Sequence, residues 1–163
     1  MMYKFDIIPI NFLKQTKSNM IMPQIYFSLQ EANELVSKIK KNVERISQLR
    51  DEIDLLDNTQ IEFEDKSVEH MILEIELNKS FYEKNLEMHT LIGNLIKQGC
   101  IIRELTTMEI DFYSRFNNRD IAFCWRPNEE KISHWHFLKE DCKKRQPIKI
   151  VERNYLDALK KLR

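Results

Sequence analysis

The feature that most constrains this chain is a run of apolar residues that recur every three or four positions from residue 32 to residue 56. This spacing places their side chains on one face of a helix. The segment from Ser28 to Glu31 has the pattern of a capping box, which begins a helix, and no glycine or proline interrupts the run. We therefore predict an amphipathic helix of roughly 28 residues, about 40 Å long, with a seam of coiled-coil spacing. The seam residues are Ala32, Leu35, Ile39, Asn42, Ile46, Leu49, Ile53 and Leu56.

A second helix is predicted over residues 66–97, because apolar residues again follow helical spacing. Its stripe consists of Val68, Ile72, Ile75, Tyr82, Leu86, His89 and Ile96. Gly99 is a suitable residue to follow its C-cap in a left-handed conformation. The loop before this helix is short, so the two helices should form an antiparallel hairpin over 29–98. Two helices cannot cover both stripes, so the remaining apolar surface must meet the C-terminal half of the chain or a second copy. We expect a homodimer through the hairpin.

After Gly99 the apolar period changes to two, which is typical of strands. Four short strands are expected at 101–105, 109–113, 121–125 and 132–136, within a small sheet over 100–137. A last amphipathic helix is expected at 151–163. The predicted fold class is therefore α+β: a long antiparallel helical hairpin packed with a small antiparallel β-sheet of about four strands, plus a C-terminal helix. Residues 22–150 should form one domain, and residues 1–21 an N-terminal extension.

Composition excludes several functions. Gly93 and Gly99 are the only glycines, and their separation fits neither a dinucleotide fingerprint, a P-loop nor a nucleophile elbow. The 26 basic residues equal the 26 acidic residues, so we do not expect nucleic-acid binding, and the basic stretch Lys143–Lys149 is interpreted as a solvated loop. No apolar run is long enough to span a membrane. The three cysteines show no C-x-x-C spacing, which favours a reducing, cytoplasmic location.

An aromatic and polar cluster is the main candidate site. Trp125, Arg126, Trp135 and His136 lie within one predicted hairpin, and together they could form a pocket for a small anionic ligand. If a four-residue loop joins the strands, Phe123 faces His134 and Ile121 faces His136. In the alternative interpretation, both tryptophans fill the core between sheet and helices, and Arg126 pairs with Glu129 or Glu130.

His134 and His136 also have a metal-ligand spacing, which Cys124, Cys142 or Asp111 could complete. The pattern is short and arises by chance, so we predict no metal and no cofactor. For catalysis, Asp111 and His136 would form an acid–base pair if the strands bring them together, with Arg126 as an anion clamp. That alternative function is a hydrolase-like or metal-dependent enzyme.

Three segments resemble a family of small prokaryotic proteins known as domain of unknown function 2203. They are 26–33 (aromatic-Ser-Leu-x-Glu-Ala-Asn), 110–112 (Ile-Asp-Phe) and 124–147, which runs from Cys-Trp-Arg to Arg-Gln-Pro. The resemblance implies an architecture but no activity. The candidate ligand-binding residues that fall on its pattern are Asp111, Trp125, Arg126, Trp135, His136 and Arg145. The chain departs from the pattern at Met108 and at 141–144, where the family has glycines, and at Tyr113, where it has proline.

The function we predict from these observations is that of a non-enzymatic binding or interaction protein. The helical hairpin would mediate assembly, and the cluster of Trp, Arg and His residues would bind a partner or a small anionic ligand.

Overall fold

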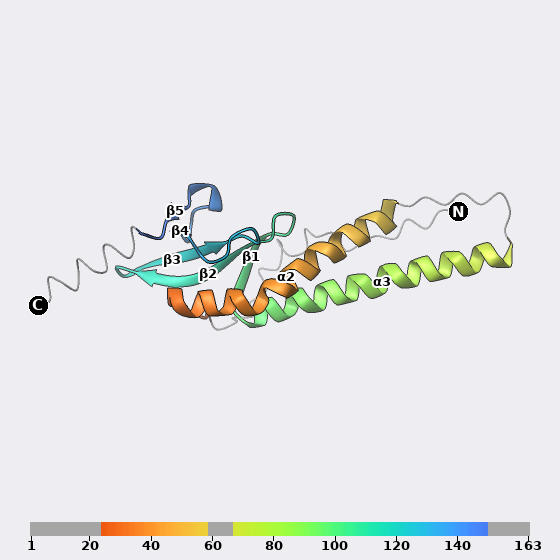
Figure 1. Ribbon diagram of the computed structural model, residues 1–163, viewed down its shortest axis with the longest axis horizontal. Helices are drawn as coiled ribbons and strands as arrows, with labels where there is room; N and C mark the ends of the chain where they lie inside the picture. Colours follow the sequence, from red (N-terminus) through yellow and green to blue (C-terminus); the bar gives the residue numbers. More distant parts are fainter. Residues whose placement is uncertain (1–23, 59–66, 150–163) are drawn as a thin grey trace, which may run out of the picture.

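The computed structural model describes residues 24–58 and 67–149 and confirms the α+β class, with a helical hairpin followed by an antiparallel sheet (Figure 1). The helices are α2 (Leu29–Asn58) and α3 (Val68–Lys97). The strands are β1 (Cys100–Glu104), β2 (Glu109–Phe116), β3 (Arg119–Trp125), β4 (His134–Phe137) and β5 (Gln146–Pro147), and the 3₁₀ turn η1 (Cys142–Lys144) precedes β5. The predicted extension at 1–21 and the predicted helix at 151–163 lie outside the described residues.

Helix α2 begins as its capping box predicts. The Ser28 Oγ accepts a hydrogen bond from the Glu31 amide at 3.2 Å, and the Glu31 carboxylate accepts one from the Ser28 amide at 2.8 Å. Most of the predicted seam is buried, whereas its members Leu35, Asn42 and Leu56 are half-buried. The buried residues of the helix are Ala32, Val36, Ile39, Val43, Ile46, Leu49 and Ile53.

Helix α3 packs differently from the prediction. Only Met88, Ile92 and Leu95, in its last third, are buried. Much of the predicted stripe is exposed instead, including Val68 and Ile75. The reason is that α3 lies against α2 and β1 mainly through its C-terminal part, and its N-terminal part projects beyond the end of α2 (Figure 1).

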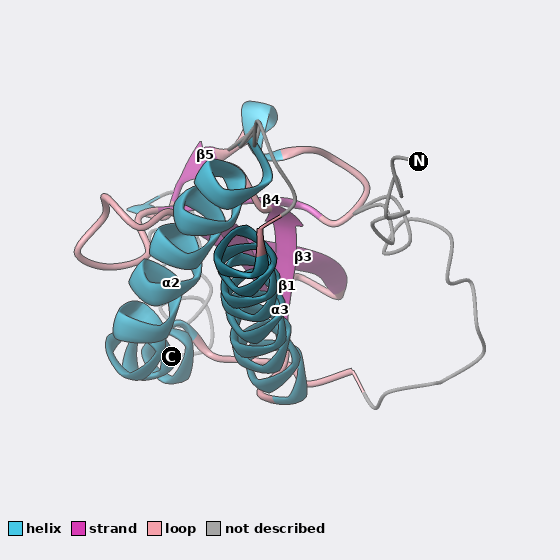
Figure 2. Ribbon diagram, turned by 90° about the vertical axis from the view of Figure 1, so that its right-hand side faces the viewer, coloured by secondary structure: helices cyan, strands magenta, loops and turns pink. Residues whose placement is uncertain are grey.

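Two ion pairs join the helices where they run side by side (Figure 2). Arg45 of α2 binds Glu87 of α3 at 2.8 Å, and Lys84 of α3 binds Glu52 of α2. Both pairs are partly exposed, so they contribute mainly to the register of the hairpin and little to its stability.

The sheet is an antiparallel meander in the order β1-β2-β3-β4-β5, with one strand more than predicted. The predicted pairing of β3 with β4 is wrong by one residue, since Phe123 faces Trp135 and Cys124 faces His134. The loop before β4 is longer than four residues because the Ile132 amide donates to Asn33 Oδ1 of α2 at 2.8 Å, rather than to β3. A shift of one residue exchanges the two faces of a strand.

The two faces of the sheet have different chemistry. One face joins the buried seam of α2 in a single apolar core. Its members from the sheet include Ile110, Phe112, Ile121, Phe123, Trp125 and Trp135. The other face carries the buried polar residues Asp111 and His136, and η1 covers it on the side away from α2 (Figure 1).

Within residues 24–58 and 67–149, three residues other than glycine have left-handed backbones. Asn117 and Asn118, with φ of 49° and 57°, form the turn between β2 and β3 where the sequence predicts one. Met108 has φ of 51° and is buried. The resemblance noted in the sequence implies glycine at this position, and a left-handed backbone is one that glycine adopts without strain.

Gly99 provides a test of this backbone chemistry. Its φ is 89°, and an added Cβ would lie 3.0 Å from the Phe27 ring, so Gly99→Ala should lower the free energy of unfolding by more than about 1 kcal/mol. Gly93 is the matched control, because it lies inside α3 and an added Cβ would meet nothing within 4 Å. Gly93→Ala should raise the stability by about 0.5–1 kcal/mol. Urea unfolding of both variants would measure these opposite changes in stability. Equal changes would contradict the left-handed conformation assigned to Gly99.

Within the residues that the structure describes, neither helix is long and apolar enough to cross a membrane.

Candidate functional site

A buried ion-pair network lies on the face of the sheet that η1 covers. Asp111 of β2 and His136 of β4 are both fully buried, and His136 Nε2 lies 3.1 Å from Asp111 Oδ2. Arg103 of β1 donates from Nε to the same carboxylate oxygen at 2.6 Å. The Asp111 carboxylate therefore joins a guanidinium from the neighbouring strand β1 and an imidazole from β4, which lies beyond β3 on the other side of β2.

The network stabilises charged forms of both buried groups. Burial alone would lower the pKa of His136, but hydrogen bonds with Asp111, Cys124 and the Phe137 carbonyl raise it to about 10. Burial alone would raise the pKa of Asp111, but His136 and Arg103 hold that pKa below its usual value. At neutral pH the group is therefore an imidazolium, a carboxylate and a guanidinium.

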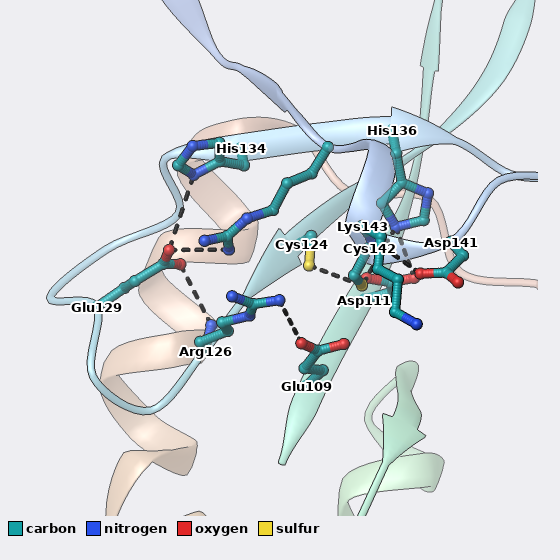
Figure 3. A network of polar contacts seen from close by, with 11 residues as sticks. Glu109, Asp111, Cys124, Arg126, Glu129, His134, His136, Asp141, Cys142 and Lys143 are labelled. Carbon is teal, nitrogen blue, oxygen red and sulfur yellow. Dashed lines mark hydrogen bonds and ion pairs between the residues drawn. The ribbon is translucent and has the colours of Figure 1, made fainter. Parts of the chain in front are cut away.

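Two free thiols adjoin this network (Figure 3). Cys124 of β3 and Cys142 of η1 have their sulfur atoms 2.9 Å apart. The Cys142 sulfur also lies 3.6 Å from Asp111 Oδ1 and 3.7 Å from His136 Nε2. Burial, the neighbouring Cys124 and the Asp111 charge together raise the pKa of Cys142. The turn that carries Cys142 is capped by Asp141, whose side chain accepts from the Lys143 amide at 2.8 Å.

A second network is centred on Glu129, in the loop between β3 and β4 (Figure 3). The Glu129 carboxylate accepts from Arg145 Nη1 at 3.0 Å and from the Arg126 amide at 3.3 Å, and it lies 3.7 Å from His134 Nδ1. The Arg126 side chain instead pairs with Glu109 of β2. These contacts fold the loop back on the sheet and hold β5 near it.

Both tryptophans belong to the apolar core. Trp125 is fully buried, and its Nε1 donates to the Glu129 carbonyl at 3.0 Å. Trp135 is also buried, and its ring packs edge-on against Phe137 with centroids 5.2 Å apart. Their burial agrees with the interpretation that they fill the core between sheet and helices.

The six candidate residues thus separate into three groups. Asp111 and His136 meet in the buried network, the tryptophans lie in the core, and the two arginines pair with Glu109 and Glu129. An open depression of about 490 Å³ adjoins Arg126. It is lined by Ser47, Thr107, Glu109, Arg126, Pro127 and Asn128, and neither tryptophan contributes to it. The anionic ligand expected at the cluster stays a prediction.

Sequence reasoning missed Arg103. The register places Ile101 opposite Asp111, so Arg103 lies diagonally across from that carboxylate, within reach of a long side chain. Only knowledge of the strand register could have indicated this contact. The proposed pair His134 and His136 is likewise divided, because His134 contacts Ser133 Oγ at 2.7 Å and Glu129 rather than Asp111.

Comparison with known protein families agrees with this architecture. Residues 25–148 match the family described as an uncharacterized conserved protein, DUF2203. The chain belongs to the DUF2203 family. The DUF2203 match contains both helices and all five strands, and therefore the buried network and the Glu129 network. Searches of curated proteins and of solved structures gave no match.

Proposed function

We propose that this DUF2203 protein is a non-enzymatic interaction protein that assembles as a homodimer through an exposed apolar face of α3. The observation that carries the proposal is the exposure of this face. Val68 is 71% exposed, Ile75 is 64% exposed and Leu86 is 71% exposed, and Met71 and Ile72 are exposed between them. Soluble monomers rarely leave large apolar patches in water, and such patches usually mark interaction sites.

Most apolar side chains of α2 already have partners within the chain. The α2 seam packs in one core with the sheet and the last third of α3. The N-terminal part of α3 projects beyond α2 and gains no such cover from the described residues (Figure 1). A second copy is therefore the occupant that we favour for this face.

The spacing of the face suits self-association. The stripe positions 68, 72, 75, 79, 82 and 86 alternate steps of four and three, so the pattern reads the same in both directions along the helix. Two such helices can pack antiparallel about a two-fold axis, which is the commonest symmetry of homodimers. With the axis near Leu77, Val68 of one copy lies opposite Leu86 of the other.

Charge also favours an antiparallel pair. In that arrangement Lys79, which interrupts the stripe, lies beside Glu76 of the second copy, and each pair occurs twice by symmetry. Lys79 lies 3.8 Å from Glu83 of its own helix, so its ammonium group already points along an acidic flank. The long aliphatic part of lysine can cover apolar surface while its charge remains at the edge.

The enzyme alternative has less support. Asp111 and His136 form a close pair, but both are fully buried, and Arg126 pairs with Glu109 instead of reaching them. General acid–base chemistry needs a substrate within hydrogen-bonding distance of the base, and the open depression at Arg126 does not include Asp111 or His136 among its lining residues.

The proposal predicts that wild-type protein has the mass of a dimer and that Ile75→Lys shifts it to a monomer. In this register residue 75 lies opposite Lys79 of the second copy. A lysine at residue 75 would therefore place two like charges together within a mainly apolar interface, which should weaken association at least about 100-fold for a penalty near 3 kcal/mol. Because Ile75 is 64% exposed in the single chain, the fold of the monomer should be unaffected. Sedimentation equilibrium over a range of concentrations measures the dissociation constant.

Asn78→Lys is the matched control, since it adds the same charge at an exposed polar position of α3 one turn away. It should leave the dimer intact. A monomeric wild-type protein at micromolar concentrations would contradict the proposal. That result would assign the cover of α3 to another part of the chain, such as residues 1–23 or 150–163.

A further inference from the structure

The buried network and the two thiols together have the composition of a metal site. Asp111, Cys124, His136 and Cys142 each offer one ligand atom, and these four atoms all lie within 4.8 Å of one another. They come from four successive elements, β2, β3, β4 and η1, and all four residues are buried. We propose that these four side chains coordinate one zinc ion, which joins η1 to the three central strands.

The distances are close to those of a tetrahedral site. Zinc bonds of about 2.3 Å to sulfur and about 2.0–2.2 Å to nitrogen or oxygen place neighbouring ligand atoms roughly 3.3–3.8 Å apart. Cys142 Sγ lies 3.6 Å from Asp111 Oδ1 and 3.7 Å from His136 Nε2. The two sulfur atoms, at 2.9 Å, have to separate by about 0.9 Å to bind the same ion. A side-chain rotation at Cys142, on a short turn, can provide this movement.

Supporting contacts orient two of the ligands. His136 Nδ1 lies 3.0 Å from the Phe137 carbonyl oxygen and donates to it, which leaves Nε2 directed at Asp111 and Cys142. Histidines that bind metals almost always donate their second ring nitrogen to such an acceptor. Arg103 holds the Asp111 carboxylate at 2.6 Å. Both contacts are those expected around a metal site. Neither uses an atom that the ion needs, because Asp111 Oδ2 accepts from Arg103 while Oδ1 binds zinc.

The charges of the occupied site also balance. Two thiolates and one carboxylate supply three negative charges, a neutral imidazole supplies none, and zinc with Arg103 supplies three positive charges. Zinc therefore replaces three protons, one from each thiol and one from the His136 imidazolium, and these are released to solvent. Ion binding exchanges protons for metal and requires no oxidant or reductant.

The ligand set indicates both the metal and its role. Two thiolates and an imidazole favour zinc over magnesium or calcium, which prefer oxygen ligands. Four protein ligands complete a tetrahedral shell and leave no open position for water or substrate, which is typical of a structural site. The ion would fix the segment from residue 138 to β5 on the sheet, with which this segment forms the short backbone pairing of β4 with β5.

The test uses full-length protein purified under reducing conditions. We expect elemental analysis to find one zinc per chain. After chelation, titration with cobalt(II) alone should give visible d–d bands and a near-ultraviolet thiolate charge-transfer band, which report tetrahedral coordination by sulfur. Wild-type protein should also melt at a lower temperature after chelation, because zinc binds the folded state.

Cys142→Ser and Cys100→Ser form the matched pair of variants. Both cysteines are buried, but Cys100 of β1 does not belong to the cluster. Cys142→Ser should weaken zinc affinity by more than the roughly 10–100-fold typical of lost supporting residues, whereas Cys100→Ser should not change it. Arg103→Gln, which removes a supporting contact, should weaken affinity by about 10–100-fold. If Cys142→Ser does not fold, the cobalt spectrum of the wild-type protein tests for tetrahedral coordination by sulfur without any variant.

Reduced wild-type protein that takes up neither zinc nor cobalt would overturn the proposal. So would equal loss of the charge-transfer band in Cys100→Ser and Cys142→Ser. A disulfide between Cys124 and Cys142 that persists in reductant and excludes both metals would also overturn it, and would assign the pair to a covalent cross-link instead.

Discussion

Replacing Asp111 by asparagine should lower the free energy of unfolding by about 3–5 kcal/mol, the range found when one partner of a buried charge pair is removed. Asp111 is fully buried and bonds to both His136 and Arg103. Asparagine has nearly the same shape but no charge, so the fully buried His136 imidazolium would lose its counter-ion in a site with little solvent, whereas the Arg103 side chain, which is 35% exposed, would stay partly hydrated. Urea unfolding in the presence of a chelator measures this effect free of any contribution from bound metal.

Asp120→Asn is the matched control for that measurement. Asp120 lies on β3 and also pairs with an arginine, Arg115, at 3.2 Å, but its side chain is 42% exposed. An exposed pair contributes no more than about 1 kcal/mol, so this variant should be nearly as stable as the wild type. If Asp111→Asn lowers the free energy of unfolding no more than Asp120→Asn does, the buried network does not stabilise the fold as we describe.

The stability difference between the wild type and Asp111→Asn should depend on pH. The pKa of His136 is raised from 6.5 to about 10, so its contribution is fully present below pH 6.5 and is lost as the pH rises through 10. The pKa of Asp111 is lowered from 3.8, so its contribution is present above pH 3.8 and is lost as the pH falls below that value. The difference should therefore be largest between about pH 4 and 6.5. A difference that grows from pH 7 to pH 10 would contradict the assigned charges.

The elements that sequence reasoning located well are those set by local interactions. The capping box, the α2 seam and the glycine after α3 each act within a few residues, and each lies where it was predicted. The turn at Asn117 and Asn118 is similar, because asparagine tolerates the left-handed backbone that a tight hairpin needs. Interactions of this kind, within a few residues, can be predicted from the sequence without knowledge of the rest of the fold.

The stripe of α3 shows where local pattern stops being sufficient. Helical spacing indicates that its residues share a face, but not which partner that face meets. Met88 and Leu95 lie outside the predicted stripe, yet they are buried, whereas Val68 and Ile75 belong to it and are exposed. The outcome depends on where α2 ends along α3, which is a property of the packed hairpin and not of either helix alone.

The candidate site depended on strand register in the same way. Cys124, Cys142 and Asp111 were recognised as ligand types, but the sequence grouped them with both His134 and His136 on spacing alone. The observed register brings only His136 to the cluster. Arg103 could not be recognised, because its contact with Asp111 crosses between strands at a diagonal position.

Trp125→Ala should lower the free energy of unfolding by about 3–5 kcal/mol, as much as Asp111→Asn, because truncation of a buried tryptophan leaves a large cavity. Trp125 is fully buried between the sheet and the helices. Had it lined an open pocket for a ligand, part of the ring would be in contact with solvent, and truncation would cost much less. Thermal and urea unfolding followed by circular dichroism would distinguish these cases.

Trp125→Phe distinguishes the contribution of the buried ring to stability from that of its hydrogen bond. Phenylalanine fills most of the space but cannot donate to the Glu129 carbonyl, which Trp125 Nε1 reaches at 3.0 Å. This variant should lose only about 1–3 kcal/mol, the cost of leaving a partly buried carbonyl without its partner. Because the Glu129 side chain holds Arg145 and the Arg126 amide, the same change should also loosen the loop before β4. Faster amide exchange at residues 126–133 in Trp125→Phe would be the sign of that coupling. An unchanged exchange pattern would mean that the carboxylate contacts alone hold the loop.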